Sequence, residues 1–136
     1  MSEIAQLPAG HPWAAVGVIV AVLALGWLLR PRRRAPRPGE VWFAQVPFED
    51  GSGSKDRPVL VLSVHDGSFE VARFTSQDRS ARRDHVRVPD GIPGLPKASW
   101  LNLRPLTLHR RAFRRRTGDP GEAFVAWYRT AAGDRV

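Results

Sequence analysis

The sequence predicts a small, mainly β domain of α+β type, built as a strongly curved barrel or half-barrel with a C-terminal helix and preceded by one transmembrane helix. Short apolar runs separated by turn signals between residues 41 and 103 indicate strands, and an amphipathic pattern near the C-terminus indicates a helix. An uninterrupted apolar stretch near the N-terminus indicates the membrane span. We divide the chain into a tail (1–12), the transmembrane helix (13–29), an Arg/Pro linker (30–39) and the domain (40–136).

The apolar stretch at 13–29, WAAVGVIVAVLALGWLL, contains no charged side chain. As a helix it rises about 25 Å, which is short but workable for a hydrocarbon core of about 30 Å, because flanking Trp and Arg side chains adapt to the interface. A buried core helix would show a polar stripe, and none is visible. A cleaved signal would carry basic residues before the apolar stretch, where this chain has Glu3 and no Lys or Arg.

Basic residues follow the apolar stretch directly, at Arg30, Arg32, Arg33, Arg34 and Arg37. The positive-inside rule therefore predicts a single-pass protein of the cell membrane whose C-terminal domain lies in the cytoplasm. The same arginines can attract anionic lipid headgroups, or they can serve as a topology signal alone. Proline and like charges keep the linker extended.

The net charge of +8 is shared equally between two parts of the chain. Residues 1–39 hold five Arg and one Glu, which gives +4, and the rest hold 16 Lys or Arg and 12 Asp or Glu, which again gives +4. This moderate excess permits a polyanionic partner without requiring one. Since the chain has no cysteine and its four histidines are scattered, we expect no disulfide, no metal site and no cofactor.

Strands are predicted at 41–46, 58–64, 68–75, 85–88 and 98–103. The continuous apolar run at 59–62 suggests a central strand covered on both faces, and Asp66-Gly67 is typical of a tight hairpin. The run RRAFRRR at 110–116 is interpreted as a short basic helix, followed by a turn at 117–121. A helix at 122–132 would place Phe124, Trp127, Tyr128 and Ala131 on one face, where they would pack on the core.

No hydrolase elbow, phosphate-binding glycine loop or histidine-zinc motif is present. The candidate that stands out is Arg57, at the entrance to the apolar strand and beside the loop EDGSGSKD at 49–56. A guanidinium there can grip a phosphate with its planar fork, or it can simply pair with the neighbouring Asp56.

These motifs resemble a known family. The segments PGEVW (38–42), GS (51–52) and RPVLVLS (57–63), followed by VARFTSQ (71–77), HVRV (85–88) and SWL (99–101), are similar in type and order to those of the MazF/PemK (Kid) toxins. The similarity extends from about residue 39 to residue 118.

The resemblance implies a dimeric SH3-like β-barrel that cleaves single-stranded RNA without a metal and is inhibited by an antitoxin protein. It implies catalytic roles for Arg57 and Thr75, and RNA contacts from Ser52, Ser54, Lys55 and Gln77. The 2′-hydroxyl of the RNA would attack the adjacent phosphate, Arg57 would neutralise the developing charge and Thr75 would position a phosphate oxygen.

The chain departs from the family pattern in two ways. Some members carry a carboxylate on the strand corresponding to 101–105, where this chain reads LNLRP. Proton transfer would then be assisted by Thr75, by water or by Asp78 and Asp84, or catalysis would be weak or lost. The N-terminal anchor is the second departure, since typical members are soluble.

Our leading hypothesis is a membrane-tethered endoribonuclease. The alternative is a non-catalytic SH3-like β-barrel that binds a protein, a nucleic acid or anionic lipid at the membrane through residues 110–116.

Overall fold

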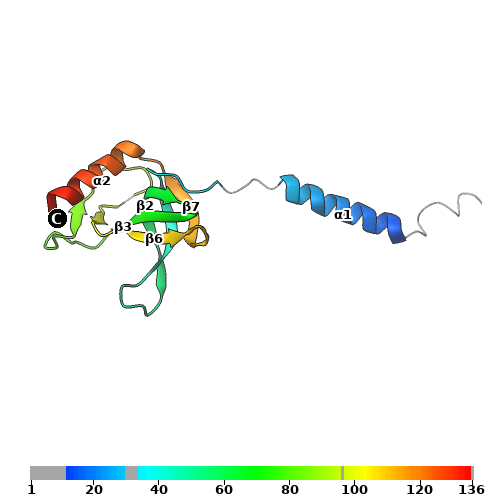
Figure 1. Cartoon of the computed structure of the whole chain (residues 1–136), viewed down its shortest axis with the longest axis horizontal. Helices are drawn as coiled ribbons and strands as arrows, with labels where there is room; N and C mark the ends of the chain where they lie inside the picture. The colour runs from blue at the N-terminus through cyan, green and yellow to red at the C-terminus, as the bar shows by residue number, and fades with distance from the viewer. Residues whose placement is uncertain (1–11, 30–33, 96, 136) are drawn as a thin grey trace, which may run out of the picture. The chain divides into compact units, whose positions relative to one another are not determined.

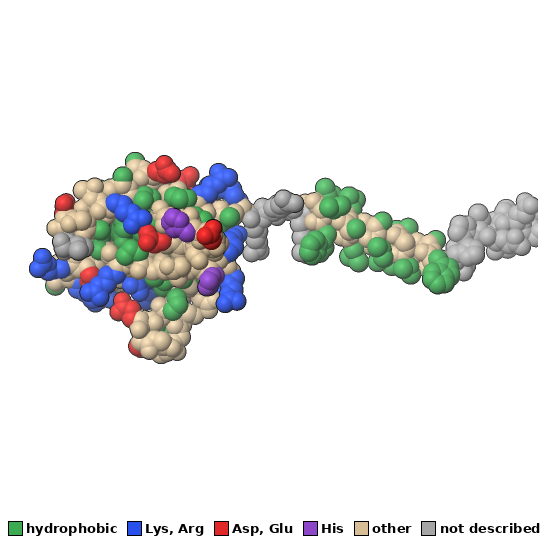
Figure 2. Space-filling view, in the orientation of Figure 1, with side chains coloured by type: hydrophobic (Ala, Val, Ile, Leu, Met, Phe, Trp, Pro, Cys, Tyr) green, Lys and Arg blue, Asp and Glu red, His purple; other side chains and the backbone are tan. Residues whose placement is uncertain are grey.

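The computed structural model describes residues 12–29, 34–95 and 97–135, and the chain divides into two units, Met1–Arg34 and Ala35–Val136. The first unit contains helix α1, Pro12–Leu29, which has no buried residue and carries apolar side chains along its length (Figure 2). By length and composition α1 is able to cross a membrane. The predicted tail up to residue 11 and the linker arginines Arg30, Arg32 and Arg33 lie outside the described residues.

The second unit is a curled, seven-stranded antiparallel sheet with one C-terminal helix lying against it (Figure 1). Its elements, in chain order, are β1 Val41–Pro47, β2 Ser54–His65, β3 Ser68–Thr75, β4 His85–Arg87, β5 Trp100–Asn102, β6 Leu106–His109, the 3₁₀ turn η3 Arg110–Ala112, β7 Phe113–Gly118 and α2 Glu122–Arg135. The predicted mainly β domain with a C-terminal helix is confirmed.

The strand order is β4-β5-β3-β2-β1-β7, and β6 pairs with β3 outside this path. Strand β3 has two partners on the same edge: its first half pairs with β6 and its last two residues pair with β5. The sheet therefore splits along β3, and β5 and β4 bend away from β6. The end of β3 lies at this split, and Thr75 is its last residue.

The basic run at 110–116 does not form the predicted helix. Residues 110–112 make a single 3₁₀ turn, and β7 then pairs with β1 as an edge strand. Phe113 explains the difference, because it is buried between Trp42 and Phe69 with ring centroids 5.9 and 5.0 Å away. The arginines that follow Phe113 stay exposed. The helix prediction was wrong because two adjacent apolar residues, Ala112 and Phe113, in a basic run show no helical period.

The core has two parts, one on each face of β2. Leu60 and Leu62 pack with Phe124 and Tyr128 of α2, as the amphipathic stripe predicted. Val59 and Val61 belong to the second part, inside the curl of the sheet. The central strand is thus covered on both faces, as its continuous apolar run predicted.

The beginning of β1 is fixed to the beginning of α2. Gly39 has a φ of +90°, and its oxygen accepts a hydrogen bond of 3.0 Å from the nitrogen of Gly121. A Cβ at Gly39 would lie 2.5 Å from the carbonyl carbon of Gly121, so the close approach requires glycine. The neighbouring Glu40 is almost fully buried and accepts hydrogen bonds from Trp42 Nε1 at 3.2 Å and from Arg116 Nη1 at 3.3 Å.

Candidate functional site

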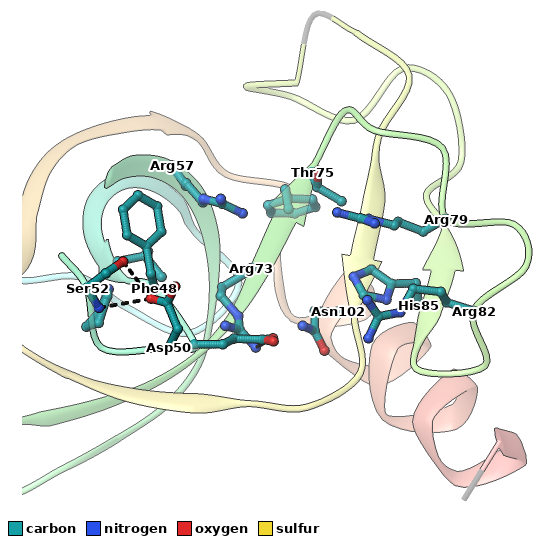
Figure 3. A pocket seen from close by; sticks show the side chains of 14 residues that line it. Phe48, Asp50, Ser52, Arg57, Arg73, Thr75, Arg79, Arg82, His85 and Asn102 are labelled. Atoms are coloured by element: carbon teal, nitrogen blue, oxygen red, sulfur yellow. Dashed lines mark hydrogen bonds and ion pairs between the residues drawn. The ribbon is translucent and has the colours of Figure 1, made fainter. Parts of the chain in front are cut away.

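A cavity of about 580 Å³ opens where the inner core ends, between the β1–β2 loop, the end of β3, the beginning of β4 and the end of β5. The labelled side chains of Figure 3 enter it from several elements. Its lining consists of Val46, Pro47, Phe48, Glu49, Asp50, Ser52, Arg57, Arg73, Phe74, Thr75, Arg79, Arg82, His85 and Asn102. Four guanidinium groups against two carboxylates give it a cationic character, which suits an anionic ligand.

Arg57 and Thr75, the two predicted catalytic residues, both line this cavity. Strands β2 and β3 are antiparallel with Val59 opposite Arg73, so Arg57 and Thr75 each lie two residues beyond that pair, on the same side of the sheet. In Figure 3 Arg57 and Arg79 extend toward the middle of the cavity from opposite sides, with Thr75 between them. The register of the hairpin, rather than any local motif, brings Arg57 and Thr75 together.

The expected pairing of Arg57 with Asp56 is wrong. Side chains of successive strand residues point to opposite faces, and Asp56 instead pairs with Arg114 of β7 across 3.7 Å. Among the described residues Arg57 makes no hydrogen bond or ion pair with another group of the protein. Its guanidinium is therefore available to a ligand in the cavity.

The four predicted RNA-contacting residues do not lie together, and three of them line one of two cavities. Ser52 lines the cavity, and its nitrogen and Oγ donate to Asp50 Oδ1 at 2.9 and 2.6 Å, which lowers the pKa of Asp50. Ser54 does not line the main cavity, and its Oγ accepts a hydrogen bond of 2.7 Å from Gln45. Lys55 and Gln77 line a smaller adjoining cavity of about 170 Å³, to which Arg57 and Thr75 also contribute.

The Thr75 hydroxyl is held in place by the chain that follows it. The nitrogen of Gln77 donates to Thr75 Oγ1 at 3.2 Å, and the Gln77 side chain accepts a hydrogen bond of 2.6 Å from Arg79. Because Thr75 Oγ1 accepts from the backbone, its own hydrogen can be donated to a bound oxygen. Gln77 thus supports the position of Thr75 as well as lining the adjoining cavity.

His85 is a cavity residue that the sequence analysis did not select. It is buried on β4, and its Nδ1 lies 2.8 Å from Asp84 Oδ1. Asp84 also accepts hydrogen bonds from Arg82 Nε and Nη2 at 3.0 and 2.9 Å. Those bonds from Arg82, and then the His85 contact, hold the pKa of the Asp84 carboxyl far below its usual range.

Both carboxylates suggested for proton transfer are poorly suited to it. Asp84 remains ionised down to low pH and is engaged by Arg82 and His85, so it is a weak proton acceptor that can instead orient the imidazole. Asp78 is exposed, accepts a hydrogen bond of 2.9 Å from the nitrogen of Ser80, which lowers its pKa, and does not line the cavity. His85 is the better candidate for moving a proton.

The strand that lacks a carboxylate contributes Asn102 to the cavity. Asn102 lies directly opposite His85 in the β4–β5 ladder, and its Oδ1 accepts a hydrogen bond of 2.8 Å from the nitrogen of Arg104. An amide cannot act as a general base at neutral pH, so Asn102 can contribute hydrogen bonds only. No group of three or more His, Cys, Asp or Glu side chains able to hold a metal ion occurs within 12–29, 34–95 and 97–135.

The curled sheet and its cavity define a small β domain with a cationic site, and the comparisons with known proteins identify its family. Residues 37–125 match the family described as PemK-like, MazF-like toxin of type II toxin-antitoxin system. The matched part is more than half of the chain, so this protein belongs to the MazF/PemK toxin family, whose members are endoribonucleases. No curated protein sequence matches the chain.

Solved structures show the same fold. An endoribonuclease from mycobacterial species aligns with a TM-score of 0.56 at 18% identity, covering 77% of this chain and 94% of its own. The Mycobacterium tuberculosis toxin MazF-mt6 aligns with a TM-score of 0.54 at 24% identity, covering 71% and 94%. A MazE-MazF structure from Deinococcus radiodurans aligns with a TM-score of 0.57 at 20% identity, covering 74% and 95%.

Proposed function

We propose that this chain is a metal-independent endoribonuclease that cleaves single-stranded RNA while α1 holds it at the cytoplasmic face of the cell membrane. The observation that carries the proposal is the meeting of Arg57 and Thr75 in one cationic cavity, where Arg57 has no partner among the described residues. An unpaired guanidinium beside a positioned hydroxyl can stabilise charge on a phosphate. Membership of an endoribonuclease family supports RNA as the substrate that carries this phosphate.

The reaction is a transesterification within the RNA. The ribose 2′-oxygen forms a bond to the adjacent phosphorus and the bond from phosphorus to the 5′-oxygen breaks, which leaves a 2′,3′-cyclic phosphate and a 5′-hydroxyl. Arg57 neutralises the negative charge that develops on the phosphate, and Thr75 donates to one of its oxygens. Removing one such donor typically slows a reaction about 10²- to 10³-fold.

His85 is our candidate for accepting the 2′-hydroxyl proton. In the tautomer that donates Nδ1–H to Asp84, Nε2 is the ring nitrogen that can accept a proton. The leaving 5′-oxygen takes its proton from water. This assignment uses groups of the chain, the RNA and water, so the proposed reaction needs no metal.

Partners and location follow from the same proposal. A related endoribonuclease from mycobacterial species has been solved in complex with its cognate antitoxin, and we propose an antitoxin and a second copy of the chain as partners here. The exposed apolar helix α1 followed by arginines supports a single-pass anchor with the domain in the cytoplasm, where RNA is present.

The competing function is non-catalytic binding of polyanions through β7. Arg111 of η3 and Arg114, Arg115 and Arg116 of β7 all have exposed side chains, so this edge of the sheet offers a basic surface. Binding through it would weaken steeply with salt and would be insensitive to Thr75.

A Thr75→Val variant of the full chain in detergent separates the two functions. We expect cleavage of a mixed-sequence single-stranded RNA to slow about 100-fold while affinity for a 2′-O-methyl RNA of the same composition changes less than about 3-fold. Thr75→Ser, which keeps the hydroxyl, should cleave nearly as well as the native chain. Binding without cleavage by the native chain at high protein excess would favour the β7 surface.

A further inference from the structure

Arg73 lies next to the proposed catalytic pair but has no role in it. It precedes Thr75 by two residues on β3, so both side chains lie on the same side of the sheet, about 6.6 Å apart along the strand. That separation is comparable with the distance between neighbouring phosphates in an extended single strand. Arg73 lines the same cavity as Thr75.

Two arginines of this cavity carry donors that the protein leaves unsatisfied. The Nε atoms of Arg73 and Arg79 are buried and have no hydrogen-bond partner. Buried donors without a partner are rare in folded proteins, because each loses its hydrogen bonds to water without replacing them. In a cationic cavity, such donors suit an anionic ligand with acceptor oxygens.

Glu49 is the acidic group that faces Arg73. Its Oε1 lies 3.5 Å from Arg73 Nη2, within ion-pair range but without a hydrogen bond. The Arg73 side chain is 15% exposed, whereas that of Glu49, on the loop between β1 and β2, is 71% exposed. The Glu49 carboxylate is therefore weakly held at the solvent-exposed edge of the cavity, whereas the Arg73 guanidinium lies deeper. A stronger acceptor can displace Glu49 from Arg73.

We propose that Arg73 forms a second phosphate-binding subsite, which holds the RNA phosphate next to the one that is cleaved, and that Glu49 occupies this subsite until RNA displaces it. The subsite rests on the proposed function, since its ligand is a phosphate of the same RNA strand. Asp50 differs from Glu49, although it lines the same cavity, because its carboxylate is bound to Ser52 rather than to an arginine. Asp50→Asn is thus a matched control for the loss of one negative charge.

The test measures binding, which needs no cleavage. The full chain in detergent is titrated with a fluorescent, mixed-sequence 2′-O-methyl RNA, which cannot react because its 2′-oxygens are blocked. We expect Glu49→Gln to tighten binding about 2- to 5-fold, since the phosphate no longer competes with an ion pair. Asp50→Asn should tighten it less, and Glu49→Gln should have no further effect when Arg73 is also changed to Gln.

Salt dependence gives the second measurement. Arg73→Gln should reduce the slope of log affinity against log salt by about 0.7, the value expected for one lost phosphate contact on a single strand, while Arg73→Lys should largely restore it. The subsite is overturned if Glu49→Gln and Asp50→Asn change RNA affinity by the same factor, both in the native chain and in Arg73→Gln. If those effects are equal while RNA is still cleaved, the proposed function stands without the subsite; if the native chain neither binds nor cleaves RNA, both fail.

Discussion

His85 Nδ1 lies 2.8 Å from Asp84 Oδ1, and this contact fixes the orientation of an imidazole that lines the cavity of Arg57 and Thr75. Asp84 is itself held by two hydrogen bonds from Arg82. The chain therefore places an oriented imidazole on β4 at the cavity, where the neighbouring strand β5 contributes the amide of Asn102.

Replacing His85 with Ala should slow RNA cleavage about 10²-fold or more, because the 2′-hydroxyl loses its proton acceptor. Affinity for 2′-O-methyl RNA should be nearly unchanged. Added imidazole should restore part of the rate in His85→Ala, and it should not accelerate the Thr75→Val variant. If His85→Ala cleaves at the native rate, His85 takes no part in proton transfer.

Asp84→Asn should lower the free energy of unfolding by about 1–2 kcal/mol at neutral pH, because hydrogen bonds to a charged group are lost. The depressed pKa of Asp84 means that this contribution is present above the ordinary value of 3.8 and is lost as pH falls through the lower folded-state pKa. Urea unfolding at pH 7, 5 and 3 should show a constant difference between the native chain and Asp84→Asn at the two higher values and a smaller difference at pH 3. If the difference in unfolding free energy between the two proteins is larger at pH 3 than at pH 7, the pKa of Asp84 is not lowered in the folded state.

Glu40→Ala should destabilise the domain by about 3–5 kcal/mol, because Glu40 is 1% exposed and its removal leaves buried donors and the Arg116 guanidinium without their acceptor. Thermal unfolding followed by circular dichroism measures the effect. Asp134→Ala, at an exposed position near the end of α2, is the control and should change stability by less than about 0.5 kcal/mol. Similar losses in the two variants would show that the buried carboxylate is not important for stability.

The proposed membrane anchor is tested by charging the middle of α1. Val20→Arg combined with Leu23→Arg should move the protein from the membrane to the soluble fraction, because each arginine near the centre of a span costs about 2.5–3.5 kcal/mol. Val20→Leu with Leu23→Val keeps the apolar composition and should remain in the membrane after alkaline extraction. If the native chain is itself extracted, α1 does not span the membrane.

Local patterns predicted much of the fold. The Asp66-Gly67 hairpin was recognisable from two residues, and both have positive φ, as its turn requires. The spacing of Phe124 and Tyr128 predicted the buried face of α2 correctly. These features depend on neighbours in sequence, and so the sequence reveals them.

The cavity could be predicted only in part, because strand register assembles it. Arg57 and Thr75 were found through family motifs, whereas His85 lies opposite Asn102 only once β4 and β5 are paired, and no local pattern marks that pair. Adjacency in sequence was misleading for Asp56, whose side chain points away from that of Arg57 toward β7. The unsatisfied donors of Arg73 and Arg79 likewise exist only in the folded chain.

The central claim, that Arg57 belongs to a metal-independent RNA-cleaving site, is tested most directly by one cleavage assay. The full chain in detergent is incubated with mixed-sequence single-stranded RNA in EDTA, and its products are compared with those of Arg57→Ala. We predict fragments ending in a 2′,3′-cyclic phosphate with the native chain, and a rate at least about 10²-fold lower with Arg57→Ala. Intact RNA with the native chain at high protein excess, or equal cleavage by Arg57→Ala, would contradict the claim.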